Sequence, residues 1–198
     1  MTAGRLAHAG GTSLDETVLV WNGVVARVPA LVVQPTSVHE IAATVAFARD
    51  HGLMLDIEGG SRIAAATSLT ERAVTLDLSR MRTITFDPDA GLVHVGPGCS
   101  PGDVERATRE RGLAGVPGFT SSDESLGYLA YLHGWAAGDL EEAEIVTADG
   151  VVRIANRHEN ARLFREIRSG AGGVGVISRL TLRIAPRKHT AAGRAQDR

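Results

Sequence analysis

The sequence predicts an α+β fold with two lobes, a small βαβ lobe followed by a mainly antiparallel lobe that carries helices. The first supporting observation is a strand, helix and strand pattern with short connections between residues 31 and 57. The second is the change of pattern after residue 73, where short alternating runs are separated by Asp, Pro and Gly residues. Such spacing is typical of antiparallel strands joined by tight turns.

Composition restricts the class of protein. The chain has 198 residues, of which 43% are hydrophobic, so it can bury a substantial core. A net charge of −2 argues against nucleic-acid binding, and no apolar run reaches the roughly 20 residues of a membrane span. The N-terminus lacks the apolar segment of a signal peptide, and the single cysteine, Cys99, fits a reducing compartment. We therefore expect a cytoplasmic protein that binds neither nucleic acid nor membranes.

The first lobe is predicted from two apolar runs and the helix between them. Residues 31–33 and 54–57 are short apolar strands, and the helix spans about residues 38–50. Ser37 and Glu40 form a capping box, in which each side chain accepts a hydrogen bond from a free backbone N–H. Short connections imply a right-handed crossover, so we expect the two strands to be neighbouring and parallel.

The second lobe is predicted as strands and turns with two helices. Ser100 and Pro101 open a helix through about Arg111, because Ser caps a helix and Pro fits its first turn. Asp149 and Gly150 mark the turn of a hairpin. The remaining predicted segments are strands within 73–79, 82–88 and 91–98, a loop at 116–125, a short helix within 160–170 and a long final strand ending near 186.

Gly170, Gly172 and Gly175 match the G-x-G-x-x-G pattern of dinucleotide-binding folds. That motif requires a strand before it and a helix after it, so that a phosphate meets the helix N-terminus. Here a helix pattern precedes the glycines and a strand pattern follows them, so we reject the dinucleotide-fold interpretation. Glycines that enter a strand still allow a ligand to approach the backbone closely.

The loop "DIEGGSRIAAATS" places adjacent glycines after a strand, an arrangement that lets backbone N–H groups approach a phosphate. Other candidate sites are weaker. The histidines lack metal-ligand spacing, and Ser121, Ser122 and Asp123 lie in no nucleophile elbow. Cys99 precedes a helix start, where a thiolate would be stabilised, but a small structural residue is the favoured interpretation. From the residues alone, the chain is an α+β domain with three glycine-bearing loops.

The order and spacing of five segments resemble the FAD-binding, PCMH-type domain of the vanillyl-alcohol oxidase / p-cresol methylhydroxylase family, particularly its berberine-bridge-enzyme-like oxidases. The resemblance covers about Trp21 to Pro186. It implies an FAD-binding domain at 21–186, preceded by an N-terminal extension at 1–20. The two lobes of this domain would span about 21–75 and 76–186. The polar, basic residues 187–198 lack apolar periodicity and are interpreted as a frayed tail rather than a phosphate-binding segment. The segments that carry the resemblance are 29–53, 59–60, 74–113, 116–118 and 144–186.

The resemblance implies that FAD lies extended between the lobes and accepts hydride in an oxidase or dehydrogenase reaction. The residues it assigns to FAD are Gly59, Gly60, Ser61 and Arg62 beside the pyrophosphate, with Gly118, Gly172, Gly175 and Val176 lining the rest of the cleft. In many relatives a histidine and a cysteine bond covalently to the flavin; the matching residues here are Ser61 and Ala137. The resemblance therefore implies non-covalent FAD, and it identifies no catalytic residue and no metal ligand.

Two departures from the family pattern predict weakened flavin binding. A second glycine-rich run after the loop at 116–118 is missing, and Asp123 and Glu124 stand near this gap. Glu58 also places a negative charge beside the pyrophosphate. Losing two or three backbone hydrogen bonds to a charged group, at roughly 1.5–3 kcal/mol each, raises the dissociation constant by at least two orders of magnitude.

A further departure is the end of the resemblance at Pro186, where relatives continue into a substrate domain. One hypothesis is a non-covalent flavoprotein in which a homodimer or a partner chain replaces that domain. A second hypothesis is a non-enzymatic scaffold that has lost flavin binding and serves as an interaction module. A third is a remnant of a longer gene without independent function.

Overall fold

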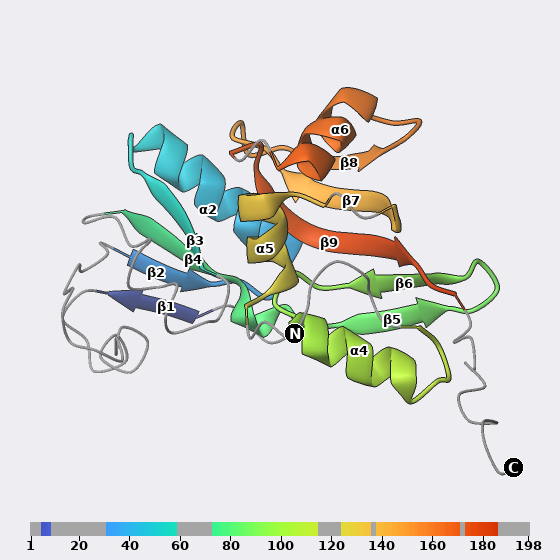
Figure 1. The fold of residues 1–198 in the computed structure, drawn as a ribbon. Helices are drawn as coiled ribbons and strands as arrows, with labels where there is room; N and C mark the ends of the chain where they lie inside the picture. Colours follow the sequence, from blue (N-terminus) through green and yellow to red (C-terminus); the bar gives the residue numbers. More distant parts are fainter. Residues whose placement is uncertain are drawn as a thin grey trace, which may run out of the picture.

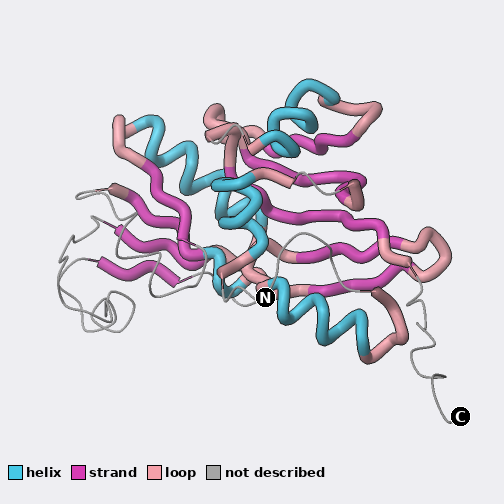
Figure 2. The backbone as a smooth tube through the Cα atoms, in the orientation of Figure 1, coloured by secondary structure: helices cyan, strands magenta, loops and turns pink. Residues whose placement is uncertain are grey.

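The protein contains two β-sheets that lie side by side and are covered by helices (Figure 1). The computed structural model describes residues 5–8, 31–58, 73–114, 124–135, 138–170 and 173–185. Among these described residues, the first sheet has four strands and the second has five. Figure 2 shows that the helices pack on the sheets. The predicted α+β class and two-lobed arrangement are confirmed.

The first sheet has the strand order β1-β2-β4-β3. Strands β2 and β3 are both parallel to β4, and β1 is antiparallel to β2. The predicted parallel direction of β2 and β3 is correct, but the prediction that they are neighbours is wrong, because β4 lies between them. The strands are β1 (Arg5–His8), β2 (Leu31–Gln34), β3 (Leu55–Glu58) and β4 (Val74–Asp77).

Strand β4 occupies the centre because every one of its residues is buried. Val74 and Leu76 are fully inaccessible, and Thr75 and Asp77 on the opposite face are also covered. A strand covered on both faces is suited to an interior position in a parallel sheet.

Helix α2 (Val38–Asp50) begins with the capping interactions that the sequence predicted. The Ser37 hydroxyl accepts a hydrogen bond from the Glu40 N–H at 3.3 Å. The Glu40 carboxylate accepts one from the N–H of Thr36, one residue before the expected donor, at 2.7 Å. Ile41 and Val45 lie on the buried face of α2, so the helix packs its apolar side against the sheet.

The second sheet has the order β5-β6-β9-β7-β8, with every neighbouring pair antiparallel. The hairpin at Asp149 and Gly150 and the long last strand are confirmed. The strands are β5 (Ile84–Asp87), β6 (Leu92–Val95), β7 (Leu140–Val146), β8 (Val152–Asn156) and β9 (Val176–Arg183).

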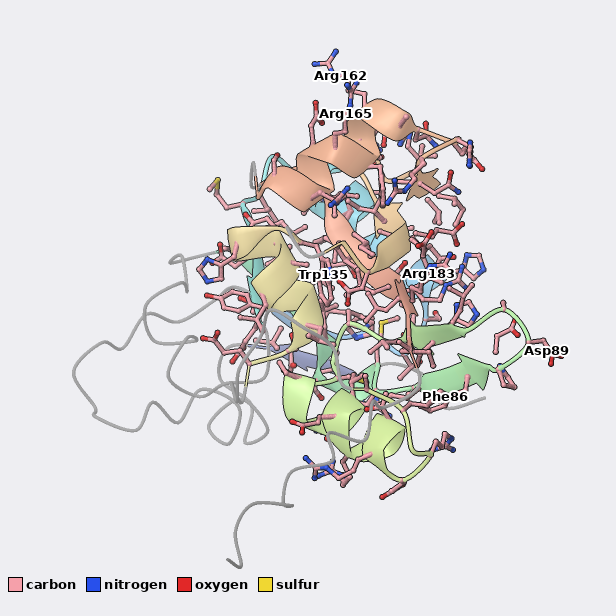
Figure 3. All side chains as sticks on the ribbon, turned by 45° about the vertical axis from the view of Figure 1, so that its right-hand side comes forward. Phe86, Asp89, Trp135, Arg162, Arg165 and Arg183 are labelled. Atoms are coloured by element: carbon pink, nitrogen blue, oxygen red, sulfur yellow. The ribbon has the colours of Figure 1, made fainter. Side chains whose placement is uncertain are left out.

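Three helices cover one face of this sheet and enclose the main core. Helix α4 (Pro101–Arg109) begins at Ser100 as predicted, with a full capping box to Asp103. Helix α6 (Ala161–Ser169) lies beside β8. Figure 3 shows Arg162 and Arg165 on the outer side of α6, whereas Trp135, at the end of α5 (Leu126–His133), is fully buried.

Helix α5 was not predicted from the sequence. All its positions from Leu126 to Ala130 are buried, so it lacks the one-sided apolar pattern by which surface helices are recognised. The Ser125 hydroxyl caps it by accepting from the Tyr128 N–H at 3.3 Å, and Gly134 ends it with φ 69°.

In the described part of the chain, no helix is both long and apolar enough to cross a membrane.

The two lobes are joined where the segment after β4 meets the end of β6. The short 3-10 helix η1 (Leu78–Arg80) follows β4 directly. The N–H of Gly98 donates to the Met81 carbonyl at 3.0 Å, and the N–H of Gly96 donates to the Thr83 carbonyl at 2.8 Å. A Cβ on Gly98 would stand 2.2 Å from the Leu78 carbonyl oxygen, so this close backbone packing requires glycine.

Gly98→Ala is therefore expected to destabilise the protein by at least about 2 kcal/mol, because backbone must move to admit the methyl group. Urea unfolding measures the change in the free energy of unfolding. Gly102→Ala is the matched control. Gly102 lies within α4, where Ala is favoured over Gly, and its added Cβ would be 3.7 Å from the Ser100 hydroxyl oxygen, an ordinary contact. Equal stability of the two variants would contradict this account of the junction.

Candidate functional site

Polar side chains gather at the C-terminal edge of the parallel strands, where ligands of open α/β sheets commonly bind. Gln34, Glu58 and Asp77 end β2, β3 and β4, and Glu58 is the register partner of Asp77. The Gln34 amide donates to an Asp77 carboxylate oxygen at 2.6 Å, and the Ser79 N–H donates to the other oxygen at 2.9 Å. Two hydrogen bonds therefore hold the Asp77 carboxyl group in place beside Glu58.

Glu58 occupies an unusual environment for a carboxylate. Only 9% of the residue is exposed, and burial, together with the nearby Asp77, raises its pKa from 4.5 to about 7. Near neutral pH the side chain is thus about half protonated. The repulsion that a fully ionised Glu58 would exert on a neighbouring phosphate is correspondingly reduced.

A pocket between the lobes begins beside this edge. Its first wall comes from α2 and β3, with Val45, Leu55 and Ile57, and α5 contributes Tyr131. The opposite wall comes from β7, its hairpin and the start of β9. The residues of that wall are Val146, Ala148, Gly173, Gly175 and Val176. The lining is mostly apolar, with glycine backbone exposed on one side, which suits a flat ring system.

Gly175 and Val176 are the two predicted site residues that the described structure places in this pocket. Gly175 has φ 146°, and a Cβ there would stand 2.4 Å from the Val146 carbonyl oxygen. Close packing on β7 therefore requires this glycine. Gly173 also has a positive φ of 70°, but its Cβ would meet nothing within 4 Å, so its backbone is accessible from the pocket.

The other predicted site residues lie outside the described residues, and their assignments stay predictions. These residues are Gly59, Gly60, Ser61, Arg62, Gly118 and Gly172, together with Ala137. The described chain nevertheless leads to the first four, because Glu58 directly precedes Gly59 and Ile57 lines the pocket.

Gly170, the first glycine of the rejected dinucleotide motif, has a packing role instead. It ends α6 in a left-handed conformation with φ 70°, and β9 follows. A Cβ on Gly170 would lie 2.4 Å from the His133 carbonyl oxygen at the end of α5. The helix–glycine–strand order and this close contact confirm that the segment is no dinucleotide-fold phosphate loop.

Cys99 is structural rather than reactive. It is fully buried, and burial, followed by the charge of Asp103, raises the pKa of its thiol to about 11. A thiolate is therefore not stabilised at this helix start. In the described part of the chain, no group of three or more His, Cys, Asp or Glu side chains is placed to hold a metal ion.

Sequence reasoning missed most of the pocket wall. Tyr131 was missed because α5 was not predicted, and Val45, Leu55 and Val146 looked like ordinary core residues. A search for apolar residues at the ends of strands that face the glycine loops would have found Val146, since it directly precedes the hairpin turn region.

The sequence profile of a family described as FAD binding domain matches residues 29–156. The chain is 32% identical over 177 residues to the FAD-linked oxidoreductase pgmH of Aspergillus terreus, covering 89% of this chain and 36% of that protein. It is 25% identical to the (R)-6-hydroxynicotine oxidase of Paenarthrobacter nicotinovorans over 93% of this chain and 43% of that protein. The chain thus spans about two fifths of the length of these relatives.

Solved structures share the fold. The 6-hydroxy-D-nicotine oxidase of Arthrobacter nicotinovorans superposes with a TM-score of 0.81 at 22% identity, covering 92% of this chain and 42% of that one. The BBE-like 1 protein of Physcomitrella patens superposes with a TM-score of 0.78 at 24% identity, with the same coverages.

Glu58→Gln is expected to stabilise the protein at alkaline pH. The folded carboxyl binds its proton more tightly than the unfolded one, so wild-type stability falls as pH rises from 4.5 through about 7. At about pH 8 the variant should be more stable by on the order of 2–3 kcal/mol, and near pH 4.5 the difference should vanish.

Urea unfolding across this pH range measures the difference. The control is Asp89→Asn, which replaces an exposed carboxyl group in the turn between β5 and β6 (Figure 3). An advantage of Glu58→Gln that stayed constant with pH would show that ionisation of Glu58 does not oppose folding.

Proposed function

Since the chain belongs to the FAD-binding domain family of berberine-bridge-enzyme-like oxidases, we propose that it holds FAD non-covalently between its two lobes and forms the flavin-binding part of an FAD-linked oxidoreductase. The observation that carries the proposal is the pocket between the lobes. There Ile57, two residues before Gly59, faces Gly175 and Val176, which the family resemblance assigns to the same cofactor.

The residues present fit such a group. The apolar walls of the pocket suit one ring system of the dinucleotide, and the open backbone at Gly173 lets a ligand approach closely. The partly neutral Glu58 lowers the repulsion expected beside the pyrophosphate. The chain's own residues would bind the cofactor, orient it and exclude water from its apolar part, while FAD supplies hydride acceptance when bound.

Non-covalent attachment is supported by the lining of the pocket and by the sequence. None of the described residues that line it is a histidine or cysteine. The positions that carry the covalent links in relatives are Ser61 and Ala137 here, and neither side chain can form the bond. The cofactor would then be retained only by packing and hydrogen bonds, so its affinity depends on the pocket.

The chain spans about two fifths of the length of these relatives, so the proposal covers only the flavin-binding part of such an enzyme. We assign substrate contacts and catalytic bases to residues outside this flavin-binding part, in the same protein, in a second copy or in a partner chain. Phe47 and Met54 are exposed at 42% and 63% on and after α2, and they are candidate contacts for such a partner.

A pocket variant tests the proposal. Ala148 is exposed at the rim, so Ala148→Trp should obstruct the pocket without disturbing the core, and Ala148→Ser is the matched control. We expect wild-type and Ala148→Ser to quench FAD fluorescence saturably, and Ala148→Trp to raise the dissociation constant by at least about tenfold.

Acid precipitation of the FAD-loaded protein tests the mode of attachment. Flavin should appear in the supernatant, and colour that stays with the precipitate would overturn the non-covalent assignment. Absence of quenching at high micromolar wild-type protein would reject flavin binding and favour a scaffold that acts as an interaction module.

A further inference from the structure

A second pocket lies where the larger sheet meets the segment that joins the lobes; we call it the junction pocket. Its floor is the face of the sheet opposite the main core, since His94 alternates with the core residues Val93 and Val95. Arg80 and Thr83 of the connecting segment form one side. The junction pocket shares no lining residue with the pocket assigned to FAD.

The junction pocket is rich in cationic and hydroxyl groups. Arg80 and Arg179 contribute two guanidinium groups, and Glu144 is the single carboxylate among the described lining residues. Glu144 already accepts a hydrogen bond from the Ser178 hydroxyl at 2.8 Å. The lining thus combines two guanidinium groups with threonine hydroxyls and the His94 ring, while Glu144 and the nearby Glu142 place carboxylates beside Arg179.

The Arg179 side chain lines the junction pocket, and its Nε donor has no hydrogen-bond partner among the described residues. Its Nη2 lies 3.6 Å from Glu144 and 3.8 Å from Glu142, beyond hydrogen-bond range for both carboxylates. The Nε atom itself is buried. The side chain as a whole is 41% exposed, so a ligand oxygen in the pocket can reach the remaining N–H donors of this guanidinium.

His94 is held in a fixed orientation on the same floor. Its Nδ1 lies 3.0 Å from the Thr181 hydroxyl, its register partner on β9. This contact fixes the ring and leaves Nε2 for a further partner. The pocket volume of about 160 Å³ admits a phosphate or a small carboxylic acid but excludes a dinucleotide.

We propose that the junction pocket binds a small oxyanion, the carboxylate or phosphate group of a compact metabolite, through Arg179, Arg80 and neighbouring hydroxyls. A planar guanidinium can pair two oxygens of either group at once. Because Thr36 of the first lobe, the connecting segment and the second sheet all line the pocket, an occupant stabilises the arrangement of the lobes. This site is separate from the flavin pocket, so its occupancy does not require FAD.

The test is thermal unfolding of the protein titrated with sodium phosphate or sodium malonate, with ionic strength held constant by sodium chloride. At ten times the dissociation constant, a ligand that binds only the folded state should raise Tm by about 3–6 °C. A rise with phosphate alone assigns a phosphate group, a rise with malonate alone assigns a carboxylate, and a rise with both assigns a general oxyanion site.

Arg179→Gln should abolish the saturable rise, whereas Arg183→Gln should retain it. Arg183 is the matched control because it lies on the same strand, pairs with Glu141 at 2.8 Å and does not line the pocket (Figure 3). If Arg179→Gln does not fold, Arg179→Lys should keep the charge and lower the affinity severalfold. No rise beyond that of sodium chloride, or an equal rise in wild-type and the Arg179 variants, would overturn the proposal.

Discussion

The packing of the first lobe against the ends of β7 and β9 is the contact on which the candidate flavin site depends. Val146 and Val176 belong to the second sheet, yet they are buried in one cluster with Ile41 of α2, Ile57 of β3 and Leu76 of β4. Each fully buried aliphatic side chain of this kind contributes about 1.5–3 kcal/mol. The shared cluster fixes the two lobes relative to each other and so fixes the two walls of the pocket.

Backbone packing around glycine completes this arrangement. Gly96 and Gly98 bring the end of β6 against the segment after β4, and Gly175 brings the start of β9 against β7. Contacts this close leave no room for a Cβ, so these glycines serve the architecture of the cleft. Gly173, whose backbone is open and lines the pocket, is a glycine of this loop that a ligand can approach closely. Glycine-rich segments of a flavin-binding fold thus combine two demands, close chain packing and ligand access.

Local sequence patterns predicted most helices and strands, but they did not predict the order of the strands in the first sheet. The capping residues Ser37 and Ser100 and the turn at Asp149 act within a few residues, so the sequence pattern reveals them. The insertion of β4 between β2 and β3 depends on which strand is buried on both faces, which no local signal shows. Tyr131 reached the pocket on a helix without a polar face. Glu58 acquired its raised pKa only when folding buried it, with the charge of Asp77 adding to the effect of burial. The family resemblance supplied the flavin site between the two lobes, because the order of separated segments carries information that single motifs lack.

Hydrogen–deuterium exchange of the protein with and without FAD tests the central claim, that the cofactor lies between the lobes, most directly. The account predicts slower exchange on FAD binding for backbone amides at 55–58, 146–148 and 173–176, which border the pocket. Amides of β5 and β6 around Thr85 and His94, on the floor of the junction pocket, should exchange at unchanged rates. Protection confined to β5 and β6, or none at saturating FAD, would contradict the account.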